Sequence, residues 1–228
     1  MSRSFLSKFR TALRRPVSCC ATAFIAASCS APIDPLEPQP CGPGFATQVA
    51  SLLYGAGAGF GQSRMPGIVL GPPNGAGTQA GSLDVVSLGL EGHVVLSFAA
   101  DGIADGPGPD FIVFENAFYA GGDSSKPFRE PATISVSDDA QTWTSFPCDV
   151  DNAPHEGCAG LRPVLASSEN SISPFDVEAA GGDAFDLQDI GVHSARFVRV
   201  QSSKQVATAN GTSGFDLDAI AVLNPACR

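Results

Sequence analysis

The chain has 228 residues with 23 acidic and 13 basic side chains, a net charge of −10, and 25 Gly and 18 Pro residues. Such an acidic chain is repelled by nucleic acid and by anionic lipid, which excludes both as general partners. The frequent Gly and Pro residues interrupt the sequence too often for long helices.

The first 28 residues have the layout of an export signal peptide. Five basic residues and no acid lie in the first fifteen positions, and a short apolar run follows over residues 17–27. This run is shorter than the roughly 20 residues that a membrane-spanning helix needs. We therefore predict a cleaved signal over residues 1–28 rather than a permanent transmembrane anchor.

The apolar run ends in Ala26-Ala27-Ser28-Cys29, which resembles the lipobox of bacterial lipoproteins. In that interpretation Cys29 is acylated and anchors the protein to a membrane, with the outer membrane or cell surface as the expected location. The alternative is ordinary cleavage at a nearby small-residue site, with Cys29 incidental.

A Pro-rich spacer is predicted over residues 29–44, because residues 31–40 read APIDPLEPQP. A single domain is predicted over residues 45–228. If the signal is removed, 8 basic residues remain against 23 acidic ones, a net charge of −15. We therefore expect the exported domain to attract cations.

Four cysteines follow Cys29, and an even number suits an oxidising compartment. Of the three possible connectivities, we favour Cys148 with Cys158, which closes a short loop, and Cys41 with Cys227, which joins the ends of the domain. The alternative is free thiols or a zinc site, although the sequence has no C-x-x-C pair.

Short runs rich in β-branched and aromatic residues alternate with turn residues. This pattern predicts an all-β fold, a β-sandwich or jelly roll. One brief helix is expected, over residues 45–53. The expected strands are residues 83–88, 93–98, 110–114, 132–136, 142–146, 196–201 and 215–223.

In the last of these strands, FDLDAIAVL, the alternation places Phe215 and Leu217 on one face and Asp216 and Asp218 on the other. The acids occur only at the start of the strand. We therefore expect Asp216 and Asp218 at the exposed rim of the domain.

Acidic residues gather in three Gly-containing segments, residues 101–116, 181–189 and 214–218. Calcium takes six to eight oxygen ligands, and Gly-rich turns allow backbone carbonyls to contribute. No EF-hand loop is present. We therefore expect calcium sites assembled from several loops; the alternative is that these acids only stabilise turns.

The sequence contains no nucleophile elbow, H-E-x-x-H motif or P-loop, so we expect no enzymatic activity. Phe118 and Tyr119 lie in a Gly-flanked loop and are the aromatic residues that we expect to stack on a sugar.

Several motifs resemble known proteins. The segments ISVSDDAQTWTSF and ARFVRVQ resemble strands of discoidin and other galactose-binding-like β-sandwiches, with Ala140 in place of a turn glycine. The ordered series VLGPP, SLGLEGHVVLSF, DGPGPDFIVFENAF, AGGDAFDLQDIG and GFDLDAIAVL is similar to a family of bacterial cell-surface proteins and lipoproteins of myxobacteria and planctomycetes.

The resemblance implies a surface location and a galactose-binding-like fold, without implying an activity. Domains of this fold commonly hold a structural calcium ion and bind sugars through loops. By position, this implies one cluster of Asp183, Asp186, Asp216 and Asp218, and a second of Asp105, Asp110 and Glu115.

The function expected from the sequence is a calcium-stabilised surface module that binds a polysaccharide or surface glycan. A structural envelope lipoprotein without a specific ligand and a glycan-acting hydrolase are the alternatives.

Overall fold

The computed structural model describes residues 42–99, 101–204 and 214–227. They belong to one compact unit that spans Pro38–Arg228. The predicted signal peptide, Cys29 and nearly all of the predicted spacer lie outside the described residues. Within the described part of the chain, no helix is long and apolar enough to cross a membrane.

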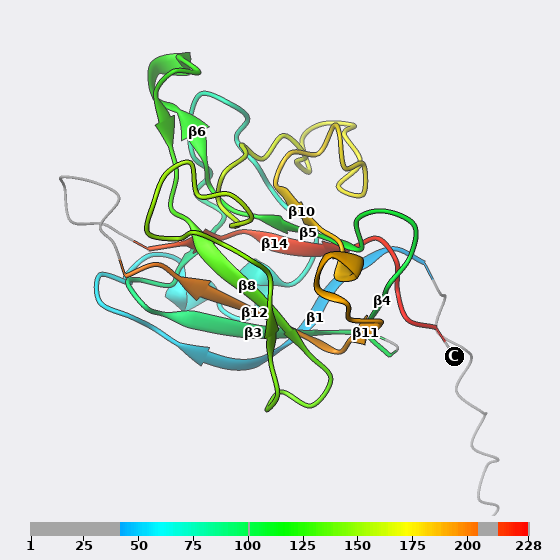
Figure 1. Ribbon diagram of the computed structural model, residues 1–228. Helices are drawn as coiled ribbons and strands as arrows, with labels where there is room; N and C mark the ends of the chain where they lie inside the picture. The colour runs from blue at the N-terminus through cyan, green and yellow to red at the C-terminus, as the bar shows by residue number, and fades with distance from the viewer. Residues whose placement is uncertain (1–41, 100, 205–213, 228) are drawn as a thin grey trace, which may run out of the picture. The chain divides into compact units, whose positions relative to one another are not determined.

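The fold is all-β, as the sequence predicts, and its main feature is a curled antiparallel sheet of eight strands (Figure 1). The order across the sheet is β10-β5-β14-β1-β3-β12-β8-β9. The strands are β1 (Gly44–Leu53), β3 (His93–Phe98), β5 (Phe111–Phe114), β8 (Ala132–Ser137), β9 (Thr144–Ser145), β10 (Asp183–Phe185), β12 (Phe197–Ser202) and β14 (Ala219–Val222).

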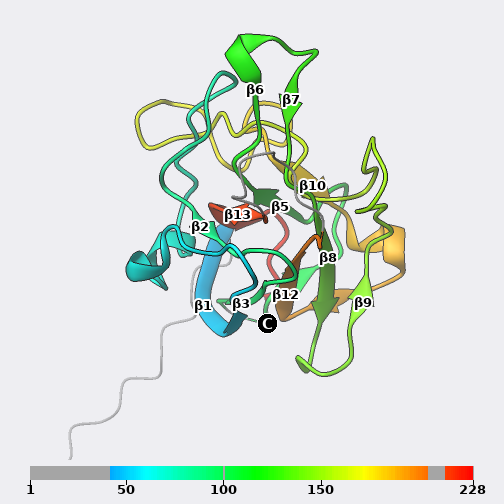
Figure 2. The same ribbon diagram turned by 90° about the vertical axis from the view of Figure 1, so that its left-hand side faces the viewer.

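Three two-stranded ribbons complete the domain: β2 (Val86–Ser87) with β13 (Asp216–Leu217), β4 (Ile103–Ala104) with β11 (Ser194–Ala195), and β6 (Phe118–Tyr119) with β7 (Pro127–Phe128). The β6–β7 hairpin projects away from the large sheet (Figure 2). Four single 3₁₀ turns are described as well, η1 (Gln62–Arg64), η2 (Gly67–Val69), η3 (Ala120–Gly122) and η4 (Leu187–Ile190).

Strand β1 joins the two layers of the sandwich. Its first residues, Gly44 and Phe45, pair with β14, while Ala46 to Leu53 pair with β3. The larger apolar core lies between the layers and combines alternate residues of β5, β3, β8 and β12. The opposite face of β5 and β14 packs beneath the loop that contains Val164 and Ala180.

The predicted helix over residues 45–53 is wrong, since this segment is strand β1. Its side chains do not alternate strictly in burial, because two irregularities in the pairing with β3 shift the register along the strand. Long-range pairing on both edges of β1 overrides the local pattern.

The predicted strand 215–223 is divided at Asp218. Phe215 and Leu217 face the larger core, but beyond the break Ile220 and Val222 occupy that core and Ala219 turns to the second one. The single alternation expected from the sequence therefore fails. Asp218 is only 1% exposed and does not lie at a rim.

The predicted disulfide between Cys148 and Cys158 is present, with a Cα–Cα distance of 4.8 Å. It closes the loop after β9. Cys227 also takes part in a disulfide, but Cys41, its predicted partner, lies outside the described residues.

The turn between β8 and β9 departs from the glycine turn of the resembling domains, because Ala140 itself adopts a left-handed conformation with φ of 58°. Asp139 stabilises the turn by accepting hydrogen bonds from the backbone N–H groups of Gln141 and Thr142. These bonds lower the pKa of Asp139 to about 2.

Candidate functional site

The pairing of β5 with β10 sorts the predicted acidic residues into two groups. Asp110 precedes β5 and Glu115 follows it, while Asp183 opens β10 and Asp186 follows it. The strands are antiparallel, with Asp183 opposite Val113 and Phe185 opposite Phe111. Asp110 and Asp186 therefore meet at one end of the strand pair, and Glu115 and Asp183 lie at the other.

At the first end, Asp105 joins Asp110 and Asp186. One carboxylate oxygen from each residue lies within 4.8 Å of the others, which is the spacing of ligands around a metal ion. Asp110 is fully buried, while Asp105 and Asp186 are partly exposed. These three acids could hold a metal ion, and the remaining ligands of a hard cation would be backbone oxygens and water.

Asp110 also has a structural role in this cluster. Its Oδ1 accepts hydrogen bonds from the Gly106 N–H and from Asn224 Nδ2, both at 2.8 Å, and its Oδ2 accepts one from the Leu187 N–H at 2.7 Å. Asp186 caps the η4 turn by accepting a bond from the Gln188 N–H. The cluster is therefore held in place before any ligand arrives.

At the second end, Asp183 and Asp218 are both occupied by backbone donors. Asp183 accepts bonds from the Gly160 and Leu161 N–H groups, and the two carboxylate oxygens of Asp218 share one bifurcated bond from the N–H of Asn74. Burial nevertheless raises the pKa of Asp183 to about 6 and that of Asp218 to about 8. Asp186 lies at the other end of the strand pair, and among the described residues no three of the predicted acids Asp183, Asp186, Asp216 and Asp218 bring ligand atoms together as a metal site requires.

Glu115 differs from the other acids because neither of its carboxylate oxygens has a hydrogen-bond partner among the described residues. The neighbouring N–H of Asn116 favours the charged form but does not complete a hydrogen bond. Glu115 is 1% exposed. Its burial, together with the charges of Glu130, Asp216 and Asp183, raises its pKa well above the ordinary value.

Two further acids lie beside Glu115. Glu130, in the short connection between β7 and β8, is 5% exposed and accepts a bond from the Gly214 N–H at 3.2 Å. Its burial and the charge of Asp216 raise its pKa to about 8. The pKa of Asp216 is also raised by burial, despite bonds from the side chains of Ser87 and Asn116.

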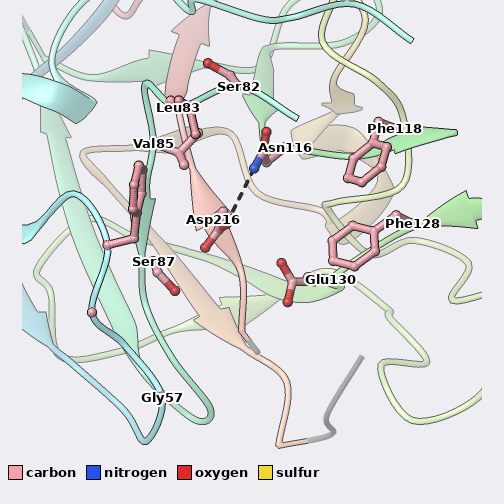
Figure 3. A pocket seen from close by; sticks show the side chains of 12 residues that line it. Gly57, Ser82, Leu83, Val85, Ser87, Asn116, Phe118, Phe128, Glu130 and Asp216 are labelled. Carbon is pink, nitrogen blue, oxygen red and sulfur yellow. Dashed lines mark hydrogen bonds between the residues drawn. The ribbon is translucent and has the colours of Figure 1, made fainter. Parts of the chain in front are cut away.

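Glu130 and Asp216 form the floor of a cavity of about 490 Å³ (Figure 3). Asn116 lies above Asp216 and donates to it at a long distance of 3.5 Å, while its amide oxygen has no partner among the described residues. The lining residues include no Lys, Arg or His among those that the structure describes. They are Gly57, Gly59, Phe60, Ser82, Leu83, Val85, Ser87, Asn116, Phe118, Phe128, Glu130 and Asp216.

The walls of this cavity, called the acidic pocket below, are apolar. Phe118 and Phe128 stack on each other across the β6–β7 hairpin with ring centroids 4.9 Å apart, and both rings stand on one side of the acids in Figure 3. Leu83, on the other side, is 75% exposed, and Phe60 is 43% exposed. Tyr119 does not line the pocket, because it follows Phe118 in β6 and side chains alternate along a strand.

Glu130, Asn116, Phe128 and Phe60 were not predicted as site residues. Glu130 is a single acid between Arg129 and Pro131 and has no acidic or glycine-rich context that would single it out. Asn116 could have been found from the sequence, because it directly follows Glu115, a predicted site residue. The other three residues could not be found from the sequence, because only the tertiary fold brings together the end of β5, the β6–β7 hairpin and β13.

Neither a protein-family model nor a curated protein matches this chain.

Proposed function

We propose that the protein is a non-catalytic binding module of the bacterial cell surface that recognises carbohydrate in the acidic pocket. A lipid anchor at Cys29 holds it to the membrane, and calcium at Asp105, Asp110 and Asp186 stiffens the opposite end of the domain.

The observation that carries this proposal is the combination of an aromatic wall with a floor of hydrogen-bond acceptors. Sugars present apolar ring faces that stack on aromatic side chains and hydroxyl groups that donate to carboxylate and amide oxygens. The Phe118–Phe128 pair offers the first kind of surface, and the carboxylates of Glu130 and Asp216 offer the second. The cavity volume of about 490 Å³ suits a small ligand or the end of a chain.

The first prediction is that Phe128→Ala weakens glycan binding by at least about fivefold, because aromatic stacking of this kind contributes on the order of 1 kcal/mol or more. A glycan array followed by calorimetry on the best ligand measures the change. Phe175→Ala serves as the control, since Phe175 stacks on Phe45 and neither residue lines the pocket. Binding by the wild type to no glycan on the array would support the structural envelope lipoprotein instead.

The second prediction concerns calcium. Added calcium at about 100 times its dissociation constant is expected to stabilise the domain by about 2.7 kcal/mol, measured as a rise in melting temperature that EDTA reverses. Asp186→Asn is expected to abolish this rise, whereas Asp176→Asn, a turn acid elsewhere, leaves it intact. An identical rise in the Asp186→Asn variant would place calcium at another site.

The residues of the acidic pocket can also be compared with what a glycan-acting hydrolase, the alternative function, would require. Such an enzyme needs one protonated and one ionised carboxyl group. In the acidic pocket burial raises the pKa values of Glu115, Glu130 and Asp216 alike, and no feature of the described lining assigns one of them as the acid and another as the base. Binding needs no such division of roles and is the simpler proposal. New reducing ends after prolonged incubation with the bound glycan would favour the hydrolase.

A further inference from the structure

We infer that the acidic pocket selects carbohydrate that carries a protonated amine, with Glu130 and Asp216 as the amine-recognising groups and Glu115 behind them. This inference rests on the proposed function and names the ligand class of the same pocket.

The first support is a set of acceptors without donors. Both oxygens of Glu115 and the amide oxygen of Asn116 have no hydrogen-bond partner among the described residues. A buried acceptor without a donor costs free energy, and the cost is larger for a carboxylate. Glu115 does not line the cavity, but an ammonium group in it would compensate the charge of Glu115, and its three donors match the carboxylates of Glu130 and Asp216, which do line it.

The second support is the charge of the pocket. Glu130 and Asp216 line the floor of the pocket. Glu115 lies behind this floor, close enough for the charges of Glu130 and Asp216 to act on its carboxyl group. Among the described lining residues no basic side chain compensates these acids. A cationic ligand would supply the missing charge, and the net charge of −10 of the whole chain would attract it from a distance.

The geometry favours an organic cation over a metal ion. Among the described residues, only Asp105, Asp110 and Asp186 bring three carboxylate oxygens within 4.8 Å of one another. The acids of the pocket are spread more widely, which suits an ammonium group with longer contacts than the 2.3–2.6 Å of calcium ligands. The aromatic wall adds a surface that attracts organic cations.

The test is a calorimetric titration with a short, fully deacetylated glucosamine oligosaccharide and with its fully N-acetylated counterpart of equal length. Acetylation removes the charge and keeps the sugar ring. The wild-type protein is expected to bind the amine form at least about tenfold more tightly, because a charged hydrogen bond contributes about 1.5–3 kcal/mol. The preference is expected to weaken as salt is added.

Glu130→Gln keeps the side-chain length and the acceptor for the Gly214 N–H but removes the charge. We expect this variant to lose most of the preference for the amine form, to within about threefold, while Glu169→Gln, the same change at an exposed loop position, retains it. The melting temperature of each variant confirms that it is folded.

The outcomes separate this inference from the proposed function. Equal binding of both oligosaccharides, weakened by Phe128→Ala, would overturn the inference and leave the carbohydrate module standing. Binding of a lysine-rich peptide with no response to either oligosaccharide would overturn both. If EDTA abolishes binding in the wild type and calcium no longer restores it in Glu130→Gln, the floor holds a metal ion and the inference fails.

Discussion

Raising the pH from 5 to 8.5 is expected to lower the free energy of unfolding of the ligand-free domain by several kcal/mol. Burial raises the pKa of Glu130 and Asp218 to about 8 and that of Asp183 to about 6. In the unfolded chain these carboxyls titrate near their ordinary values, so the folded state binds more protons across this window. The stability that these groups contribute is therefore full only below about pH 3.8, the ordinary value of the two aspartates, and it is lost as the pH rises through the folded-state values.

Glu130→Gln is expected to flatten this dependence. The variant should be more stable than the wild type at pH 8.5 by at least about 2 kcal/mol, and the difference should shrink toward pH 5, because only the ionised form of Glu130 is penalised. Urea unfolding at several pH values measures the effect. Glu169→Gln, a change at an exposed position, is the control, and its free energy of unfolding should depend on pH as that of the wild type does. A stability that is flat from pH 5 to 8.5 in the wild type would contradict buried acids with raised pKa values.

Phe111→Ala is expected to destabilise the domain by about 3–5 kcal/mol, the usual range for removal of a buried phenylalanine ring. Phe111 is fully buried between the two layers. Its ring stacks on Phe185 at 5.3 Å and meets the edge of Phe146 at 5.9 Å. The cavity left by this ring would border β5 and β10, the strand pair that positions both groups of acids.

The matched control is Phe60→Ala, because Phe60 is 43% exposed on the pocket wall. We expect this variant to change the free energy of unfolding by less than about 1 kcal/mol, as exposed substitutions usually do. Urea unfolding at pH 5 compares the two. Similar losses in both variants would indicate that the core is not organised around β5.

The all-β class could be predicted from the sequence because short β-branched runs between turn residues have few other solutions. Strand β1 could not, since its register is set by β14 and β3, which follow it by many residues in the chain. The disulfide between Cys148 and Cys158 was predictable because its loop is short.

The grouping of the acids could not be predicted from the local sequence. Asp110 and Glu115 are close in sequence, but the strand between them separates them by about 3.3 Å per residue. Asp110 instead meets Asp186 through the pairing of β5 with β10. Glu115 lies beside Asp216 and Glu130, which come from distant parts of the chain. Which acids lie together is therefore determined by which strand ends the pairing of the sheet brings side by side.

The most direct test of the acidic pocket is a nuclear magnetic resonance titration that follows the side-chain carboxyl carbons at pH 7.5. On addition of the deacetylated oligosaccharide, we expect the resonance of Glu130, whose pKa burial raises to about 8, to move toward its ionised position, because a bound ammonium group lowers that pKa. The resonances of Glu115 and Asp216, beside the same ligand, are expected to shift as well. The resonance of Glu169, an exposed acid, should stay fixed. Unmoved resonances for these three acids, with changes on another face of the domain, would contradict the proposed site.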